Sequence, residues 1–146
     1  MRVKVKKESE SINLRVATTD SAGIDLPAHL NESITINPGE TVLIGTGLYF
    51  EIPKGFFGGV FARSGLATKE GLRPANCVGI IDADYRGEVK VPLHNDSNEE
   101  RVINNGDYIA QLVIIPYMRI NLVEEDNLSE TERDDNGFGS SGKTDE

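Results

Sequence analysis

The stretch TVLIGTGLYFEI at residues 41–52 decides the fold class of this chain. It is rich in β-branched and aromatic residues, which favour strands, and the turn signal PKG at 53–55 follows it at once. A second stretch, IAQLVII at 109–115, is a nearly continuous apolar run of the kind that forms a fully buried strand. Together the two stretches predict an all-β protein.

Shorter segments on both sides alternate apolar with polar residues, as half-buried strands do. They are Val3/Val5, Ile34/Ile36 and Val89/Val91/Leu93. Further turn signals lie at 37–39, 96–98 and 104–106. Strands that recur every 8–12 residues or so predict a sandwich or barrel. One short helix is expected, from Ser64 to about Lys69, with Ser64 as its N-cap.

The chain has 146 residues, enough for one domain with a core and too few for two ordinary ones. We expect this domain to span residues 1–126. Residues 127–146 are polar and rich in glycine and serine, and we expect them to form a mobile arm in an isolated chain.

The charge pattern restricts the partners. The net charge is −9, of which −7 falls on the residues from Glu124 onward and −2 on the preceding body. A nearly neutral body with an acidic tail argues against binding of long nucleic acids, whereas a single nucleotide stays possible. The sequence has no apolar run of about 18 residues and no apolar signal core, so we expect no membrane span and a cytoplasmic location.

The cysteine and histidines do not indicate a metal or disulfide. Cys77 is the single cysteine, so no intramolecular disulfide can form, and two distant histidines complete no zinc site. We expect Cys77 to be a small buried or half-buried thiol. His29 and His94 are expected to be surface or packing residues.

Five segments stand out as candidates for chemistry. They lie at 22–26 (AGIDL), 62–67 (ARSGLA), 79–88 (GIIDADYRGE), 106–112 (GDYIAQL) and 137–142 (GFGSSG), the last after Arg133. Arg63-Ser64-Gly65 is either an ordinary helix start or a phosphate site made of backbone N–H groups, a hydroxyl and a guanidinium.

Two other segments also have a structural and a functional interpretation. Asp82 and Asp84 alternate with apolar residues, so on a strand both would face one side, either as a solvated face or with one as a general base. The aromatic Tyr85 beside them, at a hairpin tip, favours the second interpretation. The glycine-rich tail is typical of a flexible linker, but Phe138 within it also suits stacking on a nucleobase.

In this order and spacing, the five segments resemble the five motifs of the homotrimeric dUTPase family, from about residue 14 to residue 142. The resemblance implies a jelly-roll-like, distorted β-barrel that assembles as a homotrimer. It implies three active sites, each built from two chains and closed by the arm of the third. The implied reaction converts dUTP to dUMP and pyrophosphate, which keeps uracil out of DNA and supplies dUMP for dTMP synthesis.

The resemblance also implies roles for single residues. Asp82 would be the catalytic base that deprotonates a water for in-line attack on the α-phosphorus. Tyr85 would lie under the deoxyribose and exclude a 2′-hydroxyl, and the hairpin 76–85 would read uracil through backbone groups and the Asn76 amide. The implied substrate-binding residues are Arg63, Ser64, Gly65, Asn76, Gly79, Ile80, Ile81, Tyr85, Lys90, Gln111, Arg133, Phe138 and Gly139.

Among these, Arg63 with its two neighbours and Gln111 would hold the phosphates. Arg133 would reach the γ-phosphate, and Phe138 would stack over uracil. The implied cofactor is Mg²⁺, held mainly by the three phosphates and by waters. Asp25 would sit near the water shell of this metal or brace Arg63.

The sequence departs from the family pattern at four positions. Asp134 and Asn136 stand where the family usually has glycines after Arg133. The two acids beside this arginine, Asp134 and Asp135, should weaken docking of the arm through like-charge repulsion. Tyr108 stands where an arginine is common. Pro92 interrupts a predicted strand, which suggests an edge strand or a bulge.

Two rival functions stay open at this point. A dCTP deaminase shares the fold and the arginine-serine element, although the intact segment 82–87 favours hydrolysis. A regulatory protein that uses the nucleotide site as a sensor is the second rival.

Overall fold

The computed structural model describes residues 1–76, 78–132 and 134–135. The predictions for Cys77, Arg133, Phe138 and Gly139 therefore lie outside the described residues.

The described chain contains twelve strands and one short helix. The elements are β1 (Lys4–Lys7), β2 (Arg15–Val16), β3 (Ile24–Pro27), β4 (Ile34–Ile36), β5 (Thr41–Gly45), β6 (Leu48–Glu51), β7 (Phe56–Phe61), η1 (Leu66–Glu70), β8 (Leu72–Pro74), β9 (Gly79–Ile81), β10 (Lys90–Asn95), β11 (Arg101–Ile103) and β12 (Tyr108–Pro116). The predictions of an all-β chain and of one short helix are confirmed.

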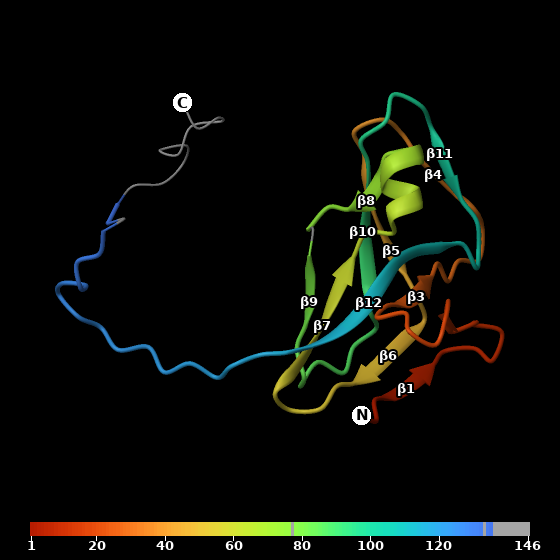
Figure 1. Cartoon of the computed structure of the whole chain (residues 1–146). Helices are drawn as coiled ribbons and strands as arrows, with labels where there is room; N and C mark the ends of the chain where they lie inside the picture. Colours follow the sequence, from red (N-terminus) through yellow and green to blue (C-terminus); the bar gives the residue numbers. More distant parts are fainter. Residues whose placement is uncertain (77, 133, 136–146) are drawn as a thin grey trace.

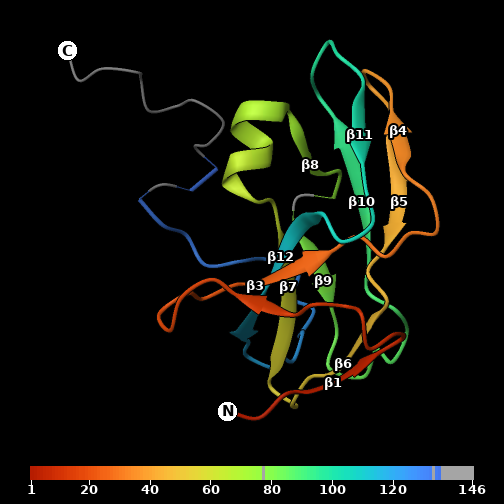
Figure 2. The ribbon, with the colours of Figure 1, turned by 90° about the vertical axis from the view of Figure 1, so that its right-hand side faces the viewer.

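The strands form four small antiparallel sheets around one core (Figures 1 and 2). The largest has the order β2-β3-β12-β7-β9, and a three-stranded sheet has the order β5-β10-β8. Two pairs, β1-β6 and β11-β4, complete the body. Nearly all pairings join segments far apart in the sequence, so the fold is fixed by which strands share buried faces.

The stretch 41–52 crosses from one sheet to another. Its first part, β5, pairs with β10, and its second part, β6, pairs with β1. The break falls at Thr46 and at Gly47, whose φ of 63° lies in the left-handed region that favours glycine. The buried Thr46 hydroxyl donates to the Val89 carbonyl at 2.6 Å, which ties the break to the chain just before β10.

The stretch 109–115 forms most of β12, which lies between β3 and β7 in the largest sheet. Ile109, Ala110 and Leu112 are buried, whereas residues 113–115 are only partly buried. The prediction of a fully buried strand therefore holds for the first half of β12 and is wrong for the second half. The reason is that the second half runs beyond β3 and is flanked only by β7.

The prediction for Pro92 is wrong. Pro92 lies in β10, the middle strand of its sheet, and β10 pairs with β5 in continuous register. The Pro92 carbonyl accepts from the Ala75 N–H at 2.7 Å, just past Pro74, the end of β8. In an antiparallel pair the N–H and C=O of one residue face the same neighbouring strand, so the N–H that Pro92 lacks would also point toward residue 75. Because residue 75 lies beyond the end of β8, the proline costs no hydrogen bond within the β8 ladder.

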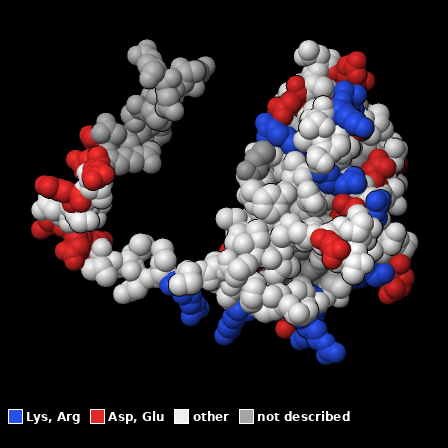
Figure 3. All heavy atoms as spheres, viewed as in Figure 1, with Lys and Arg blue, Asp and Glu red and all other residues white. Residues whose placement is uncertain are grey.

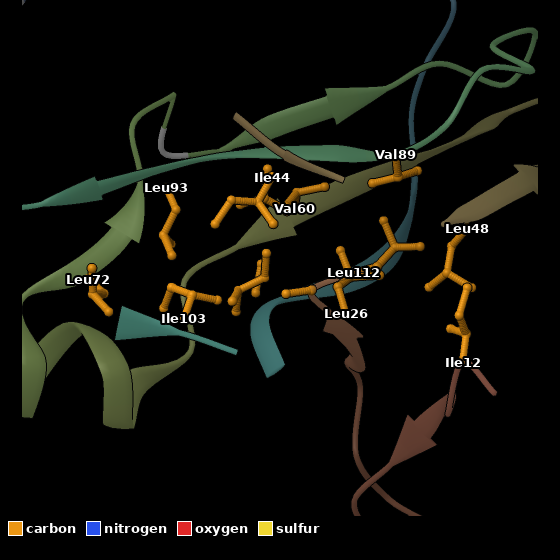
Figure 4. Packing of buried hydrophobic residues seen from close by; sticks show 14 of the residues in the cluster. Ile12, Leu26, Ile44, Leu48, Val60, Leu72, Val89, Leu93, Ile103 and Leu112 are labelled. Atoms are coloured by element: carbon orange, nitrogen blue, oxygen red, sulfur yellow. The ribbon is translucent and has the colours of Figure 1, made fainter. Parts of the chain in front are cut away.

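The core is one cluster of buried aliphatic side chains and a single phenylalanine, with contributions from every sheet (Figure 4). Val89, Val91 and Leu93 are fully buried on one face of β10 and its approach, as their alternation predicts. Asn95 is the largest buried polar side chain, and its amide donates to the carbonyls of Ile36 and Glu99. These bonds fix the turn at 96–98.

The helix differs in detail from the prediction. Residues 64 and 65 begin a helical turn that continues as the π-helix η1, and no side chain caps its start. Ser64 is therefore not a side-chain N-cap. Its carbonyl accepts a hydrogen bond from the Thr68 hydroxyl at 2.7 Å, and the residue is exposed at the surface.

After β12 the chain leaves the body, as Figure 1 shows. Apolar residues on this segment are strongly exposed, among them Met118 (86%), Ile120 (76%) and Leu122 (84%). Acidic side chains gather beyond them, while lysines and arginines project from the lower edge of the body (Figure 3). No helix within the described ranges has the length and apolar character needed to span a membrane.

Candidate active site

Arg63 is held in place by two neighbouring strands. It lies just after β7, and its Nε donates to Asp25 Oδ1 on β3 at 3.0 Å. Its Nη1 donates to the carbonyl of Tyr108, at the start of β12, at 2.8 Å. Bonds from one guanidinium to two strands fix the direction of its remaining N–H groups.

Gln111 lies next to Arg63 because β12 pairs with both β3 and β7. Its position in the register is opposite Asp25 on one side and opposite Phe61 on the other. Its amide nitrogen donates to the Ala62 carbonyl at 2.8 Å. A Cβ atom at Gly23 would lie 2.5 Å from Gln111 Oε1, so a larger residue there would displace this amide from its present position.

These residues surround a cavity of about 410 Å³. Ser64 and Gly65 are exposed at its wall, and Asp25 is buried. The lining residues include Arg15, Asp25, Arg63, Ser64, Gly65, Lys69 and Gln111. The structure thus brings together the predicted residues of the segments at 22–26, 62–67 and 106–112. Exposed backbone N–H groups, a hydroxyl and a fixed guanidinium suit phosphate oxygens.

Asp25 uses both carboxylate oxygens on arginines. Oδ1 accepts from Arg63, and Oδ2 lies 3.5 Å from Arg15 Nε. The contacts are those of a brace for Arg63, one of the two predicted roles of Asp25. Its place near the water shell of a metal stays a prediction.

Asp82 lies directly after β9, at the start of a tight turn. The Tyr85 N–H donates to the Asp82 carbonyl at 3.1 Å, and the side chains of Asp82 and Asp84 are both exposed. The two acids are therefore on a turn and not on a strand. The Asp82 carboxylate makes no hydrogen bond within the part of the chain that the structure describes, so it is open to solvent.

Among the described residues of the segment 76–85, no two strands pair as a hairpin. Its one strand, β9, pairs with β7, opposite residues 58–60. β9 pairs along the edge of β7 that β12 leaves free, opposite Gly58, Gly59 and Val60. The prediction of a hairpin is wrong in this respect, although the turn after β9 is present.

Asp82 lines a second cavity, of about 660 Å³. Asp84 and Glu51 share this cavity with a set of cations, which are Arg2, Lys4, Lys54, Arg86 and Arg119. Lys4 donates to Glu51 at 3.0 Å, and this hydrogen bond lowers the pKa of Glu51. The cations outnumber the acids, so the cavity favours an anionic ligand.

The residues predicted to read the base lie on β9 and beside it. Ile80 is exposed (64%), and Asn76 lies over the Gly79 backbone, because a Cβ atom on Gly79 would be 3.0 Å from Asn76 Nδ2. The Tyr85 hydroxyl donates to the Glu88 carbonyl at 3.0 Å, which fixes an exposed ring. None of these residues lines the cavity of Asp82.

Ile81 is partly buried against the core. Lys90, at the start of β10, is exposed, and its Nζ lies 3.5 Å from Glu88 Oε2. The structure places neither residue in the two cavities described above.

Sequence reasoning missed two groups of charged residues. One is Arg15 beside Asp25, and the other is the set of cations around Asp82. The contact of Arg15 depends on the pairing of β2 with β3, for which the two-residue β2 carries little signal. Apart from Arg86, which belongs to the segment 79–88, the cations around Asp82 come from distant segments and follow no motif.

The carboxylates that the structure describes do not form a protein cage for a metal. Residues 1–76, 78–132 and 134–135 contain no group of three or more histidine, cysteine or acidic side chains arranged to hold an ion. This donor set fits an ion that arrives bound to phosphates and needs water-mediated contacts only.

Comparisons with known proteins agree with the resemblance. The profile of the dUTPase family matches residues 9–142. The chain is 44% identical to a deoxyuridine 5'-triphosphate nucleotidohydrolase of Finegoldia magna, over 97% of this chain and 99% of the relative. It is 49% identical to the enzyme of the same name from Wolbachia pipientis, over 98% and 97% of the two chains.

Solved structures show the same fold. A dUTPase of Staphylococcus bacteriophage 80alpha, with bound dUPNHPP, superposes with a TM-score of 0.82 at 28% identity, over 97% of this chain and 98% of that one. A variant of a dUTPase from the same phage gives a TM-score of 0.85 at 27% identity, over 96% and 98% of the two chains. Matches that cover nearly the full length of both chains confirm the predicted family, and the chain belongs to the dUTPase family, whose members are nucleotide-hydrolysing enzymes.

Proposed function

We propose that the chain hydrolyses dUTP to dUMP and pyrophosphate, and that Asp82 deprotonates the attacking water. Asp82 is exposed on a turn, and no described side chain occupies its carboxylate. A carboxylate in this state can accept a proton from a water held in line with the α-phosphorus. The reaction would keep uracil out of DNA and supply dUMP for dTMP synthesis.

The phosphates bind in the cavity around Arg63. The guanidinium is fixed by Asp25 and Tyr108, and the Ser64 hydroxyl and the Gly65 backbone are exposed beside it. Gln111 orients the phosphate chain and the water from the same wall. Fixed donors of this kind stabilise charge that develops during in-line displacement, without reorganisation at the moment of reaction.

Mg²⁺, held by the phosphates and waters, would offset the negative charge of the triphosphate when bound. Two acids, Asp25 and Glu70, line the phosphate cavity, and Asp25 is the one that contacts Arg63. Its two oxygens already contact arginines, so any contribution to the metal passes through water.

The sites are shared between copies in a homotrimer. This proposal rests on the separation of the two halves: the cavity of Asp82 and the cavity of Arg63 have no lining residue in common. A general base must lie within hydrogen-bond reach of the water that attacks the bound phosphate. A second copy that presents its Arg63 cavity to Asp82 would meet this need.

The segment after β12 supports assembly. Met118, Ile120 and Leu122 are exposed and alternate with polar residues, as one apolar face of a strand does. An isolated chain would leave this apolar face in water, so a partner surface is expected. Residues 127–146 would then reach a neighbouring site as the closing arm, with Arg133 at the γ-phosphate and with Phe138 and Gly139 at the base.

Uracil is read by the segment around β9. The exposed residue Ile80, with Gly79 and Ile81 beside it and the Asn76 amide over Gly79, would offer backbone and amide groups in a donor and acceptor pattern that cytosine does not match. The Tyr85 ring leaves no room for a 2′-hydroxyl under the sugar. Lys90 borders the base.

The test is analysis of the products formed from dUTP, UTP, dTTP and dCTP in turn. We expect dUMP and pyrophosphate from dUTP, and little reaction with the others. Ammonia release from dCTP would instead identify a deaminase. Tight binding of dUTP without turnover would identify a nucleotide sensor.

A further inference from the structure

Arg15 and Asp25 form a cross-strand pair. β2 and β3 are antiparallel, and their register places Arg15 directly opposite Asp25. Residues directly opposite each other lie on the same face of a sheet, and an opposite-charge pair there is stabilising. Arg15 Nε accordingly lies 3.5 Å from Asp25 Oδ2.

Asp25 and Tyr108 hold Arg15 and Arg63 as a pair. Each guanidinium contacts one oxygen of Asp25, and each lies over the Tyr108 ring, at 5.4 Å for Arg15 and 5.6 Å for Arg63. The Tyr108 hydroxyl is itself fixed by a hydrogen bond from Asn13 at 3.1 Å. An aromatic face attracts a cation and limits its orientation.

The charges around this pair leave an excess of one positive charge. The cavity is lined by the cations Arg15, Arg63 and Lys69 and by the acids Asp25 and Glu70. One carboxylate between two guanidiniums neutralises only one of them. The second positive charge is therefore available to an anion in the cavity.

Arg15 has hydrogen-bond donors left for such an anion. A guanidinium carries five N–H donors, and Arg63 uses donors on two of its nitrogens on the protein. The shortest contact of Arg15 with Asp25 is made by Nε, and no hydrogen bond from its Nη groups is found within the described ranges. Its side chain is half exposed (50%) and lines the cavity.

We propose that Arg15 is a further phosphate-binding arginine, held beside Arg63 by Asp25 and Tyr108, that contacts the phosphate chain beyond the α-phosphate. Two adjacent guanidiniums suit neighbouring phosphate groups, because each can contact a different one. The inference rests on the proposed function, since it assigns a residue to the triphosphate cavity of that same site.

The experiment is calorimetric titration with two ligands, dUMP and a non-hydrolysable imido analogue of dUTP. Arg15→Ala should lower the affinity for the analogue about tenfold or more, as loss of hydrogen bonds to a charged group does. Its affinity for dUMP should stay within about twofold of the wild type. Arg15→Lys should fall between Arg15→Ala and the wild type, because it keeps the charge and loses the planar donor set.

Lys6→Ala is the matched control. Lys6 also places a cation over a tyrosine ring, with its Nζ 4.7 Å from the Tyr49 centroid, but it does not line this cavity. The Lys6→Ala variant should bind both ligands with the affinity of the wild type. Unchanged affinity of Arg15→Ala for the analogue would overturn the inference, and so would an equal loss for both ligands.

Failure of the proposed function has a different signature. A wild-type protein that binds neither ligand and does not hydrolyse dUTP would contradict that function as a whole. A wild-type protein that does both, with an Arg15→Ala variant indistinguishable from it, would contradict the role of Arg15 alone.

Discussion

The two halves of the candidate site differ in how much of their geometry one chain fixes. Around Arg63, a carboxylate, a carbonyl and an aromatic ring hold the functional side chain. Around Asp82, the carboxylate of the proposed base is exposed and the nearby cations come from several separate segments. The half around Arg63 is thus preorganised within the chain, whereas in the half around Asp82 one chain fixes less of the geometry.

The largest effect is expected from Asp82→Asn. Loss of the general base should lower kcat by about 10²- to 10⁴-fold, with little change in affinity for the imido analogue. Asp84→Asn is the matched control, because Asp84 is exposed on the same turn and lines the same cavity. The rate of pyrophosphate release measures kcat for both variants. An active Asp82→Asn enzyme would exclude Asp82 as the base.

Removal of residues 133–146 should have the next largest effect. The arm is proposed to exclude water and to add Arg133, so the rate should fall on the order of a hundredfold. The oligomer and its unfolding temperature should not change, which sedimentation and calorimetry can check. An undiminished rate would show that the arm is dispensable.

A smaller effect is expected from Asp25→Asn, which tests the preorganised half. An amide would hold the two guanidiniums more weakly, so kcat/KM should fall about tenfold through loss of orientation. Glu99→Gln is the control, because Glu99 also pairs with an arginine, Arg101, but at the exposed surface. Equal rates for Asp25→Asn and the wild type would show that the brace does not matter.

The smallest change in rate, but a specific one, is expected from Tyr85. Tyr85→Ala should raise the ratio of UTP to dUTP hydrolysis by about tenfold, the size of a modest steric discrimination. Tyr85→Phe keeps the ring and loses only the hydrogen bond to the Glu88 carbonyl, so its ratio should match the wild type. A ratio unaffected by Tyr85→Ala would refute the steric explanation of sugar choice.

Local pattern predicted the strands well. The alternation at 89–93 and the apolar run at 109–115 became β10 with its approach and β12, because burial of one face is encoded by neighbouring residues. Turn signals such as 104–106 also fell between strands, since their backbone demands are local.

Partner choice could not be predicted in the same way. The pairing of β9 with β7 rather than within a hairpin, and the place of Pro92 at the end of a ladder, depend on strands distant in sequence. The Arg15–Asp25 contact depends on register in the same manner. The motifs identified Asp25, Arg63 and Gln111, but not the arginine that completes their cavity.

The most direct test of the shared site mixes two inactive variants, Asp82→Asn and Arg63→Ala. If Asp82 of one copy works with Arg63 of another, each mixed trimer contains one intact site. Chains refolded together in equal amounts should then recover about a quarter of the wild-type activity, as random assembly of a three-fold ring gives. A mixture as inactive as its two components would contradict the account, because it would place both residues of a working site on one chain.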